Sequence, residues 1–369
     1  MKVLVAMSGG VDSSVAALLM KREGFQVIGA FMKNWSDPAS NAGGPVGECA
    51  WKDDRRSAMK VAAKLKIPLV TLDFEKQYRK DVIDEMFKLY KKGITPNPDI
   101  DCNQKVKFPL LWSAAKSLGC DFIVTGHFAR IKKTRKGYEM LRASDEKKDQ
   151  SYFLYRLNEG DLSHSLFPIG QYTKKQVREI AKKNGLASWD RKSTVGICFV
   201  GKVNLKEFLK KKIKPKKGKI LDSEGNQIGI HDGIYYYTIG QRLGPRYGIE
   251  LIKNSKDKAH VRRWYVARKD VKKNEIIAAP EGHPLLYRKE IVINQPHWIN
   301  EAPGKSRTHK VHARIRQVGE LLPSVLKYNK KKKKFEVSLK RAITGVSEGQ
   351  AIVLYRGKKV LGGGVIGFE

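Results

Sequence analysis

The chain has 369 residues, in which 73 lysines and arginines outnumber 37 aspartates and glutamates, so its formal net charge is +36. This length predicts two or three domains with an ample core, and the charge favours a polyanionic partner, either nucleic acid or an anionic membrane. No uninterrupted apolar stretch approaches the length of a membrane span, and the short apolar run before Ser8 is not a signal peptide. We therefore expect a soluble, cytoplasmic protein with no membrane partner. Lysines also occupy many surface-like positions without a pattern, as in a general composition bias, so the charge gives nucleic acid only partial support.

The first predicted element is a buried strand over Val3–Ala6, followed by the segment Met7–Ser14. Gly9 and Gly10 allow a tight turn, and the apolar spacing from Val11 onward predicts a helix. A strand, turn and helix in this order direct several unpaired backbone N–H groups at one place, which suits a bound phosphate. Asp12 could hold a metal ion there. No lysine follows the glycines, so the motif is not a P-loop; an ordinary strand–helix turn is the alternative.

Strands and helices alternate as far as about residue 130, which predicts a doubly wound α/β domain with a parallel sheet and helices on both faces. The predicted strands are Gln26–Phe31, Leu69–Leu72 and Asp121–Thr125, and the predicted helices are Arg55–Leu65 and Phe74–Lys91. Ligands bind such sheets at the carboxyl ends of the strands. Ser8, Met32 and Gly126 all follow or end a strand, and the Gly/Pro/Ser-rich stretch between Asn34 and Glu48 is long enough for a mobile cover.

The pattern changes in the second half of the chain. The predicted elements here are two helices, Asp149–Leu157 and Thr173–Asn184, a hairpin over Gly218–His231, and strands at Tyr235–Tyr237 and Trp264–Val266. From Lys289 to Glu369 short alternating strands with glycine turns predict a small antiparallel β-barrel, in which the run Lys330–Lys334 is a solvated hairpin tip. We therefore predict three domains: a catalytic domain over 1–210, a small connecting domain over 211–280 and a C-terminal barrel over 281–369.

Four cysteines in a chain of this length do not form a disulfide scaffold, and their spacing does not predict a zinc site. Cys120 begins a buried strand and is expected in the core, whereas Cys49 has no evident chemical role. Cys102 and Cys198 lie in loops with proline or glycine, where reactive groups are common. Taken alone, either thiol would be incidental more often than not.

The motif Ser8-Gly9-Gly10-Val11-Asp12-Ser13 resembles the PP-loop family of ATP pyrophosphatases, which cut ATP between its α and β phosphates and adenylate an acceptor. Within that group the whole chain resembles the bacterial tRNA-specific 2-thiouridylases. The matching segments are Phe31–Trp35, Thr95–Asp99 with Cys102-Asn103, Thr125–His127, Lys148–Leu154, Gly196–Phe199, Gly240–Arg242 and Leu361–Gly364. The resemblance implies an adenine nucleotide alpha hydrolase-like PP-loop domain, a connecting domain and a tRNA-contacting barrel.

The family's roles can be carried over to the matching positions. The residues that match the family's ATP-binding positions are Ala6, Met7, Ser8, Gly9, Gly10, Val11, Asp12, Ser13, Met32 and Gly126. Mg²⁺ is expected to bind together with ATP. The target base falls on Asn97, Pro98 and Asp99. Contacts with tRNA fall on His127, Asp149, Gln150, Ser151, Arg314, Ile315 and Gln350. Cys102 matches the nucleophile and Cys198 the cysteine that carries a persulfide. Ile315 stands where many relatives have tyrosine, which puts base stacking there in doubt, and Leu243-Gly244-Pro245 replaces the usual Gly-Leu.

The resemblance implies thiolation of C2 of the wobble uridine. Adenylation of O2 would turn a poor leaving group into AMP, after which the Cys198 persulfide would deliver sulfur and Cys102 would break the S–S bond, leaving a disulfide. Asp99 is near enough to Cys102 in sequence to accept a proton, although a turn or helix cap is its alternative role. The expected partners are the anticodon stem and loop of tRNA and a persulfide-donor protein, and we expect a monomer. Two alternatives remain open: a PP-loop ligase acting on a small molecule, and a non-catalytic RNA-binding protein.

Overall fold

The computed structural model describes residues 1–36, 50–191, 204–244, 250–251 and 263–368. Cys49 and Cys198 lie outside these residues. Most of the stretch between Asn34 and Glu48, which was predicted to be a mobile cover, lies outside them too. Within the described parts of the chain, no helix has both the length and the apolar character needed to cross a membrane.

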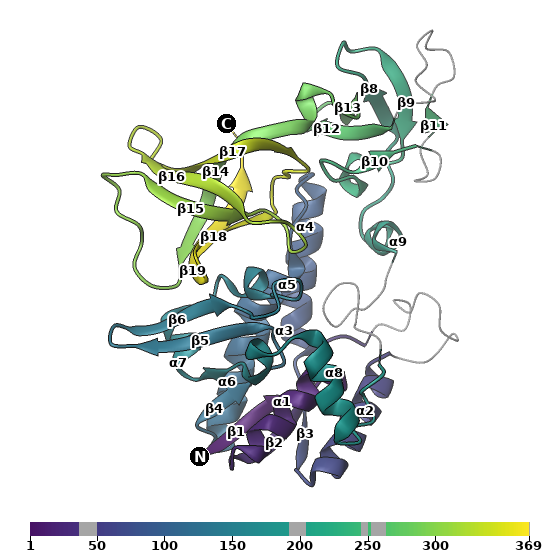
Figure 1. The fold of residues 1–369 in the computed structure, drawn as a ribbon. Coiled ribbons are helices and arrows are strands. Elements are labelled where there is room, and N and C mark those ends of the chain that lie inside the picture. The colour runs from purple at the N-terminus through teal and green to yellow at the C-terminus, as the bar shows by residue number, and fades with distance from the viewer. Residues whose placement is uncertain (37–49, 192–203, 245–249, 252–262, 369) are drawn as a thin grey trace.

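The N-terminal part is built on a five-stranded parallel sheet in the order β3-β2-β1-β4-β7 (Figure 1). The strands are β1 (Lys2–Ala6), β2 (Gln26–Lys33), β3 (Leu69–Asp73), β4 (Phe122–Val124) and β7 (Ser165–Leu166). Val3 and Val5 contribute to one core with α1 (Val11–Arg22), α2 (Ala50–Leu65) and α8 (Lys174–Lys183). Leu4 and Ala6 contribute to a second core with α6 (Phe108–Ser117). Alternate residues of β1 therefore face opposite helical layers, and the predicted doubly wound domain is confirmed.

Two helical stretches of this domain contain π turns. The predicted helix over Phe74–Lys91 runs as α3 (Glu75–Tyr78), η2 (Arg79–Asp84) and α4 (Glu85–Lys91). In the same way α5 (Pro98–Asp101) leads through η3 (Cys102–Lys107) into α6. Single π turns inside helices are frequent at functional sites, and the second one begins at Cys102.

The predicted helix over Asp149–Leu157 is wrong. Only a short 3₁₀ turn, η4 (Ser151–Leu154), forms there, followed by α7 (Glu159–Ser163) and η5 (Pro168–Gln171). The Asp149 carboxylate accepts hydrogen bonds from the backbone N–H groups of Ala143 and Ser151 at 3.0 and 3.3 Å. Such side-chain bonds to the local backbone compete with a regular helix. The helix predicted over Thr173–Asn184 is confirmed as α8, with a capping box between Thr173 and Gln176.

The connecting part begins with α9 (Leu205–Lys210) and contains a sheet in the order β10-β12-β13-β8-β9-β11. Its strands are β8 (Gly218–Leu221), β9 (Gln227–His231), β10 (Arg242–Leu243), β11 (Glu250–Leu251), β12 (Trp264–Asp270) and β13 (Glu275–Pro280). The predicted β8–β9 hairpin is confirmed. The strand predicted at Tyr235–Tyr237 is wrong: Ile234–Tyr236 forms a 3₁₀ turn, η6, after Gly233 with φ of 152°.

The C-terminal strands form the predicted antiparallel barrel. They are β14 (Tyr287–Trp298, after the turn η8, Pro284–Leu286), β15 (His309–Arg314), β16 (Leu322–Asn329), β17 (Lys334–Thr344), β18 (Ala351–Arg356) and β19 (Lys359–Gly367). Their order is β14-β17-β16-β15-β18-β19, and β14 also pairs with β19, which closes the ring. The turn between β16 and β17 is exposed, as expected for the lysine run at its tip.

A hairpin of the first domain extends this barrel's sheet. β5 (Ala129–Thr134) and β6 (Gly137–Arg142) pair with each other, and β6 joins β19 through Leu141 and Lys359. The Arg142 N–H also donates to the Lys358 carbonyl at 2.8 Å. Strands far apart in the sequence thus share one sheet across two domains (Figure 1).

Candidate active site and RNA-contacting residues

The segment Ser8–Ser14 forms a loop that its own hydroxyl groups brace. Ser13 Oγ accepts from Ser8 N–H at 3.2 Å and donates to the Gly10 carbonyl at 3.1 Å, while Ser14 Oγ donates to the same carbonyl at 2.8 Å. Gly10 is the N-cap of α1 and makes no side-chain cap bond. The first N–H groups of a helix have no partner within the helix. This end of α1 is therefore suited to bind an anion.

The carboxyl ends of β1, β2 and β4 meet at this loop. Ala6 is paired with Ala30 and Val5 with Val124, so the adjacent Met32 and Gly126 follow at the same edge of the sheet. A Cβ placed on Gly126 would lie 2.6 Å from the Ser13 nitrogen, which shows how tightly the end of β4 packs against α1. The structure thus brings together the residues predicted to bind ATP; their role remains a prediction.

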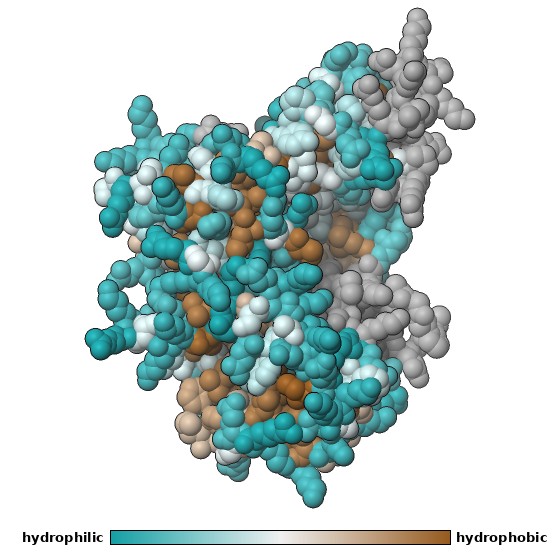
Figure 2. Space-filling model, viewed as in Figure 1, coloured by the Kyte–Doolittle hydropathy of each residue, from teal (hydrophilic) through white to brown (hydrophobic). Residues whose placement is uncertain are grey.

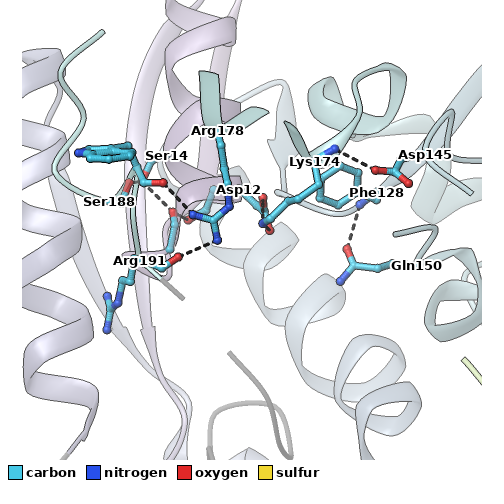
Figure 3. Close-up of polar contacts among 12 residues, drawn as sticks. Asp12, Ser14, Phe128, Asp145, Gln150, Lys174, Arg178, Ser188 and Arg191 are labelled. Atoms are coloured by element: carbon cyan, nitrogen blue, oxygen red, sulfur yellow. Dashed lines mark hydrogen bonds and ion pairs between the residues drawn. The ribbon is translucent and has the colours of Figure 1, made fainter. Parts of the chain in front are cut away.

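Lys174 lies beside this loop and was not found from the sequence (Figure 3). It is the first residue of α8, and its Nζ donates to both Asp12 carboxylate oxygens at 2.6 and 2.7 Å. Its backbone N–H donates to Asp145 at 2.9 Å, and Nζ lies 5.7 Å from the centroid of the Phe128 ring. Asp12 and Lys174 are 162 residues apart. The only local signal was the capping pattern Thr173-x-x-Gln176, which marks Lys174 as the start of a helix.

The predicted Mg²⁺ can be tested against these residues. Mg²⁺ is usually bound through one or two carboxylates together with substrate phosphates. Both oxygens of Asp12 accept from Lys174, so a metal ion bound at Asp12 would share this carboxylate with the lysine ammonium group. Among the described residues, no group of three or more His, Cys, Asp or Glu side chains could hold a metal ion without a ligand, so phosphates of ATP would have to supply part of the coordination of Mg²⁺.

The segment that contains Cys102 lies where the three parts of the chain meet. Gln350 of the barrel donates through Nε2 to the carbonyls of Thr95 and Pro96 at 2.8 and 2.9 Å. Thr95 Oγ1 lies 3.0 Å from Thr238 Oγ1 of the connecting part. Cys102 is fully buried at the start of η3. Gln350 therefore connects the barrel to the segment that precedes Cys102. This contact was not predicted from the sequence, which indicated only that Gln350 contacts tRNA.

Asn97, Pro98 and Asp99 form the start of the short helix α5. Asn97 is its N-cap residue and Pro98 its first helical residue. Asp99 lies within the first turn, so the cap position that was its alternative role belongs to Asn97. All three residues are partly exposed, and their contact with the target base stays a prediction.

Several residues predicted to contact tRNA are buried where the barrel meets the first domain. Asp149, Ser151, Arg314 and Ile315 are at most 4% exposed. Arg314 Nη1 donates to Asp149 Oδ2 at 2.9 Å, and Ser151 Oγ donates to the same oxygen at 3.0 Å. Gln150 Oε1 accepts from the Phe128 N–H at 2.9 Å. Contact of these residues with tRNA stays a prediction, while the observed contact between Arg314 and Asp149 joins the barrel to the first domain.

His127 packs between aromatic and polar neighbours and is only partly exposed. Its ring stacks on Phe108 with centroids 5.9 Å apart, and its Nδ1 lies 2.7 Å from Thr125 Oγ1. Burial and the nearby Lys107 ammonium hold the pKa of His127 well below its usual value. The imidazole is therefore neutral near pH 7 and serves as a hydrogen-bonding group.

This shift predicts a pH effect on stability. Because the pKa of His127 is depressed in the folded state, the unfolded chain binds a proton below about pH 6.5 that the folded chain does not bind. This difference lowers the free energy of unfolding by up to about 1.4 kcal/mol for each pH unit. The free energy of unfolding should therefore fall as the pH drops from 6.5 to 5, and His127→Gln should reduce this slope in urea titrations. His312→Gln, at an exposed position of β15, controls for the loss of an imidazole. An unchanged slope in His127→Gln would contradict the assignment.

Two of the four cysteines are among the described residues. Cys102 lies at the junction of the three parts, whereas Cys120 is buried in the core beneath α6, as predicted. Burial raises the pKa of the Cys120 thiol. Cys198 and Cys49 lie outside the described residues, so the distance between the two predicted sulfur-handling thiols is not part of this structure.

A parallel sheet whose strand ends carry a braced Ser-Gly-Gly loop at a helix N-terminus defines a nucleotide-binding α/β enzyme of the PP-loop class. Three family models match the chain: the tRNA methyl transferase HUP domain over residues 1–202, the tRNA methyl transferase PRC-barrel domain over 206–280 and the aminomethyltransferase β-barrel domain over 288–366. The tRNA-specific 2-thiouridylase MnmA of Ruthia magnifica is 41% identical over 100% of this chain and 98% of its own length. That of Bacillus licheniformis is 40% identical over 99% of this chain and 94% of its own. The chain belongs to the tRNA-specific 2-thiouridylase family.

Two solved structures resemble parts of the fold more distantly. NMN synthetase from Francisella tularensis is 17% identical, with a TM-score of 0.34 over 56% of this chain and 71% of that one. A 4-thiouridine synthetase in complex with RNA and ATP is 16% identical, with a TM-score of 0.36 over 57% and 50%. At these scores neither likeness carries an argument about function.

Proposed function

We propose that this protein is an ATP-dependent tRNA-uridine 2-sulfurtransferase that thiolates C2 of the wobble uridine. The observation that carries the proposal is the anion-binding loop Ser8–Ser14 at the carboxyl edge of the sheet, in a chain that matches 2-thiouridylases over its full length. A non-catalytic RNA-binding protein would leave this loop without a purpose.

The first step is adenylation of the uracil. O2 attacks the α-phosphorus of ATP, the bond to the β-phosphate bridging oxygen breaks, and pyrophosphate leaves. Backbone N–H groups at the start of α1 would stabilise the charge that moves onto pyrophosphate. Lys174 would supply the cation that the loop motif lacks, because its ammonium already lies beside the loop on Asp12. Mg²⁺ bound with ATP would neutralise further phosphate charge.

The second step transfers sulfur. The terminal sulfur of a persulfide on Cys198 attacks C2, its proton is lost, and AMP leaves, so that the base is joined to Cys198 through two sulfurs. The Cys102 thiolate then attacks the Cys198 sulfur, which releases the 2-thio base and forms a Cys102–Cys198 disulfide. External thiols reduce this disulfide. Asp99, three residues before Cys102 on the same helical stretch, would accept the Cys102 proton.

The wobble base is easier to bring into such a site than a paired base is, because extruding a base costs least in a single-stranded loop. Exposed lysines and arginines at the tips of the β5–β6 and β16–β17 hairpins would attract the phosphate backbone. Figure 2 shows that hydrophilic residues cover most of the visible face. We further propose a catalytic unit over 1–210, a connecting unit over 211–280, a tRNA-contacting barrel over 281–369, a persulfide-donor protein as partner, and a cytoplasmic monomer.

The test incubates an unmodified tRNA transcript with the full chain, ATP, Mg²⁺ and a sulfur source, followed by mass spectrometry of the nucleosides. With sulfide, which bypasses the donor, 2-thiouridine should form only when ATP is present. Pyrophosphate release without tRNA dependence, or no thiolation at all, would contradict the proposed function.

Glutathione persulfide in place of sulfide tests the role of Cys102. Cys198 is first loaded with the persulfide, and all glutathione is removed by gel filtration before tRNA and ATP are added. In a single turnover Cys102→Ser should then release no free 2-thiouridine, because the thiolate that cleaves the S–S bond to Cys198 is missing. Cys120→Ser is the matched control: it removes a buried thiol from the core and should retain thiolation. Equal product from both variants would refute the role of Cys102.

A further inference from the structure

The carbonyl of Gly9 is held from outside the nucleotide loop. It accepts a hydrogen bond from Ser57 Oγ of α2 at 2.8 Å and another from Arg191 Nη1 at 3.1 Å. Gly9 is buried and has φ of 75°, a conformation that glycine adopts without strain. A Cβ on Gly9 would lie 2.3 Å from the Asp54 carbonyl oxygen, so α2 packs directly against this peptide.

Holding this oxygen also fixes the next N–H group. The peptide between Gly9 and Gly10 is planar and trans, so its C=O and N–H point in opposite directions. With the oxygen fixed toward Ser57 and Arg191, the Gly10 N–H points back into the loop, where it donates to Ser8 Oγ at 3.4 Å. A rotated peptide would present a carbonyl oxygen, which repels phosphate, in place of an N–H donor.

Arg191 is itself held in place. Its guanidinium forms an ion pair with Asp54 of α2. Its carbonyl accepts from Arg178 Nη2 of α8 at 3.1 Å, as Figure 3 shows. Its N–H donates to the Ser188 carbonyl at 3.2 Å, and Ser188 Oγ donates to Ser14 Oγ at 3.0 Å. The turn over 188–191 therefore touches the loop at both ends, at Gly9 and at Ser14.

We propose that Arg191, together with Ser57, is a positioning residue that keeps the Gly9–Gly10 peptide turned so that its N–H faces the nucleotide phosphates. The inference rests on the proposed use of ATP. Arginine suits the task because one guanidinium donates at once to a carbonyl and to a carboxylate, whereas a lysine ammonium lacks that fixed fork.

The experiment measures binding of ATP and of inorganic pyrophosphate to the full chain by calorimetry. Arg191→Gln should weaken both about tenfold or more, Ser57→Ala less, and Arg191→Lys to an intermediate degree. Because both donors hold one oxygen, the losses in Arg191→Gln/Ser57→Ala should not be additive. Adenosine, which has no phosphates, should bind all variants alike.

Arg55→Gln is the matched control. Arg55 lies on the same helix as Asp54 and donates to Thr71 at 2.9 Å, so its loss removes one positive charge from α2 without touching the loop. Wild-type affinity for ATP and pyrophosphate in a folded Arg191→Gln or Ser57→Ala protein would overturn the inference. Equal weakening of ATP and adenosine would also overturn it, since that pattern indicates general distortion. If the wild-type protein itself fails to bind ATP, the proposed function fails instead.

Discussion

Asp149→Asn is expected to lower the free energy of unfolding by about 3–5 kcal/mol, the usual cost of breaking a buried ion pair by removing one partner. The Asp149 side chain is fully buried and the Arg314 side chain is only 5% exposed, so neither charge can be hydrated once the other is lost. Arg142 Nε also lies 3.6 Å from Asp149 Oδ2. The isosteric amide keeps the shape of the site but removes the carboxylate from the buried Arg314 guanidinium, whereas Arg142 keeps an ion pair with Glu146 at 3.4 Å.

Urea unfolding followed by circular dichroism measures this loss. Glu139→Gln is the control, because Glu139 and Lys359 also join the first domain to the barrel, at 2.6 Å, but remain partly exposed. Its cost should stay below about 1 kcal/mol. Asp149→Asn/Arg314→Met should recover part of the loss, since one unpaired charge is then gone. Equal, small effects in Asp149→Asn and Glu139→Gln would contradict this account of the junction.

Gly126→Ala is expected to reduce kcat/KM for ATP about 100-fold, the order expected when reacting groups are displaced by about 1 Å. The added methyl would lie 2.6 Å from the Ser13 nitrogen and 2.7 Å from the Asp12 carbonyl carbon. Both contacts are with backbone, so the first turn of α1 and the end of β4 must separate. That movement displaces the N–H groups predicted to bind phosphate.

Overpacking alone costs about 1–3 kcal/mol in stability, so thermal unfolding is measured alongside the kinetics. Gly304→Ala is the control, because a Cβ there meets nothing closer than Arg307 Nε at 4.0 Å. A folded Gly126→Ala protein with wild-type kcat/KM for ATP would show that this contact does not position the loop.

The parts of the fold that the sequence predicted correctly depend on local patterns. The strand–turn–helix of Ser8–Ser14, the capped helix α8 and the closing barrel are visible in hydrophobic periodicity and turn residues. The strand predicted at Tyr235–Tyr237 failed because aromatic residues favour strands only on average. There Tyr237 donates to Asp232 at 2.8 Å, a polar contact within the turn.

The motif of the candidate site could be predicted from the sequence, but the distant residues that hold it in place could not. Lys174 on Asp12, Arg191 on Gly9 and Arg314 on Asp149 each join residues more than 160 positions apart. Nothing in the residues near either partner indicates such a pair, because it depends on how helices and domains pack. The resemblance named Asp149 and Arg314 as residues that contact tRNA, but it could not indicate that they contact each other.

The sheet shared by β5, β6 and the barrel has a consequence for how these proteins can diverge. The edge of β19 beside Lys359 is covered by a hairpin encoded more than 200 residues earlier. If the C-terminal domain were replaced by that of a relative, its β19 would no longer match the β5–β6 hairpin of this chain unless residues 129–142 were replaced as well. Chimeras joined only at the domain borders in the sequence should therefore be less stable than chimeras that exchange residues 129–142 together with the C-terminal domain.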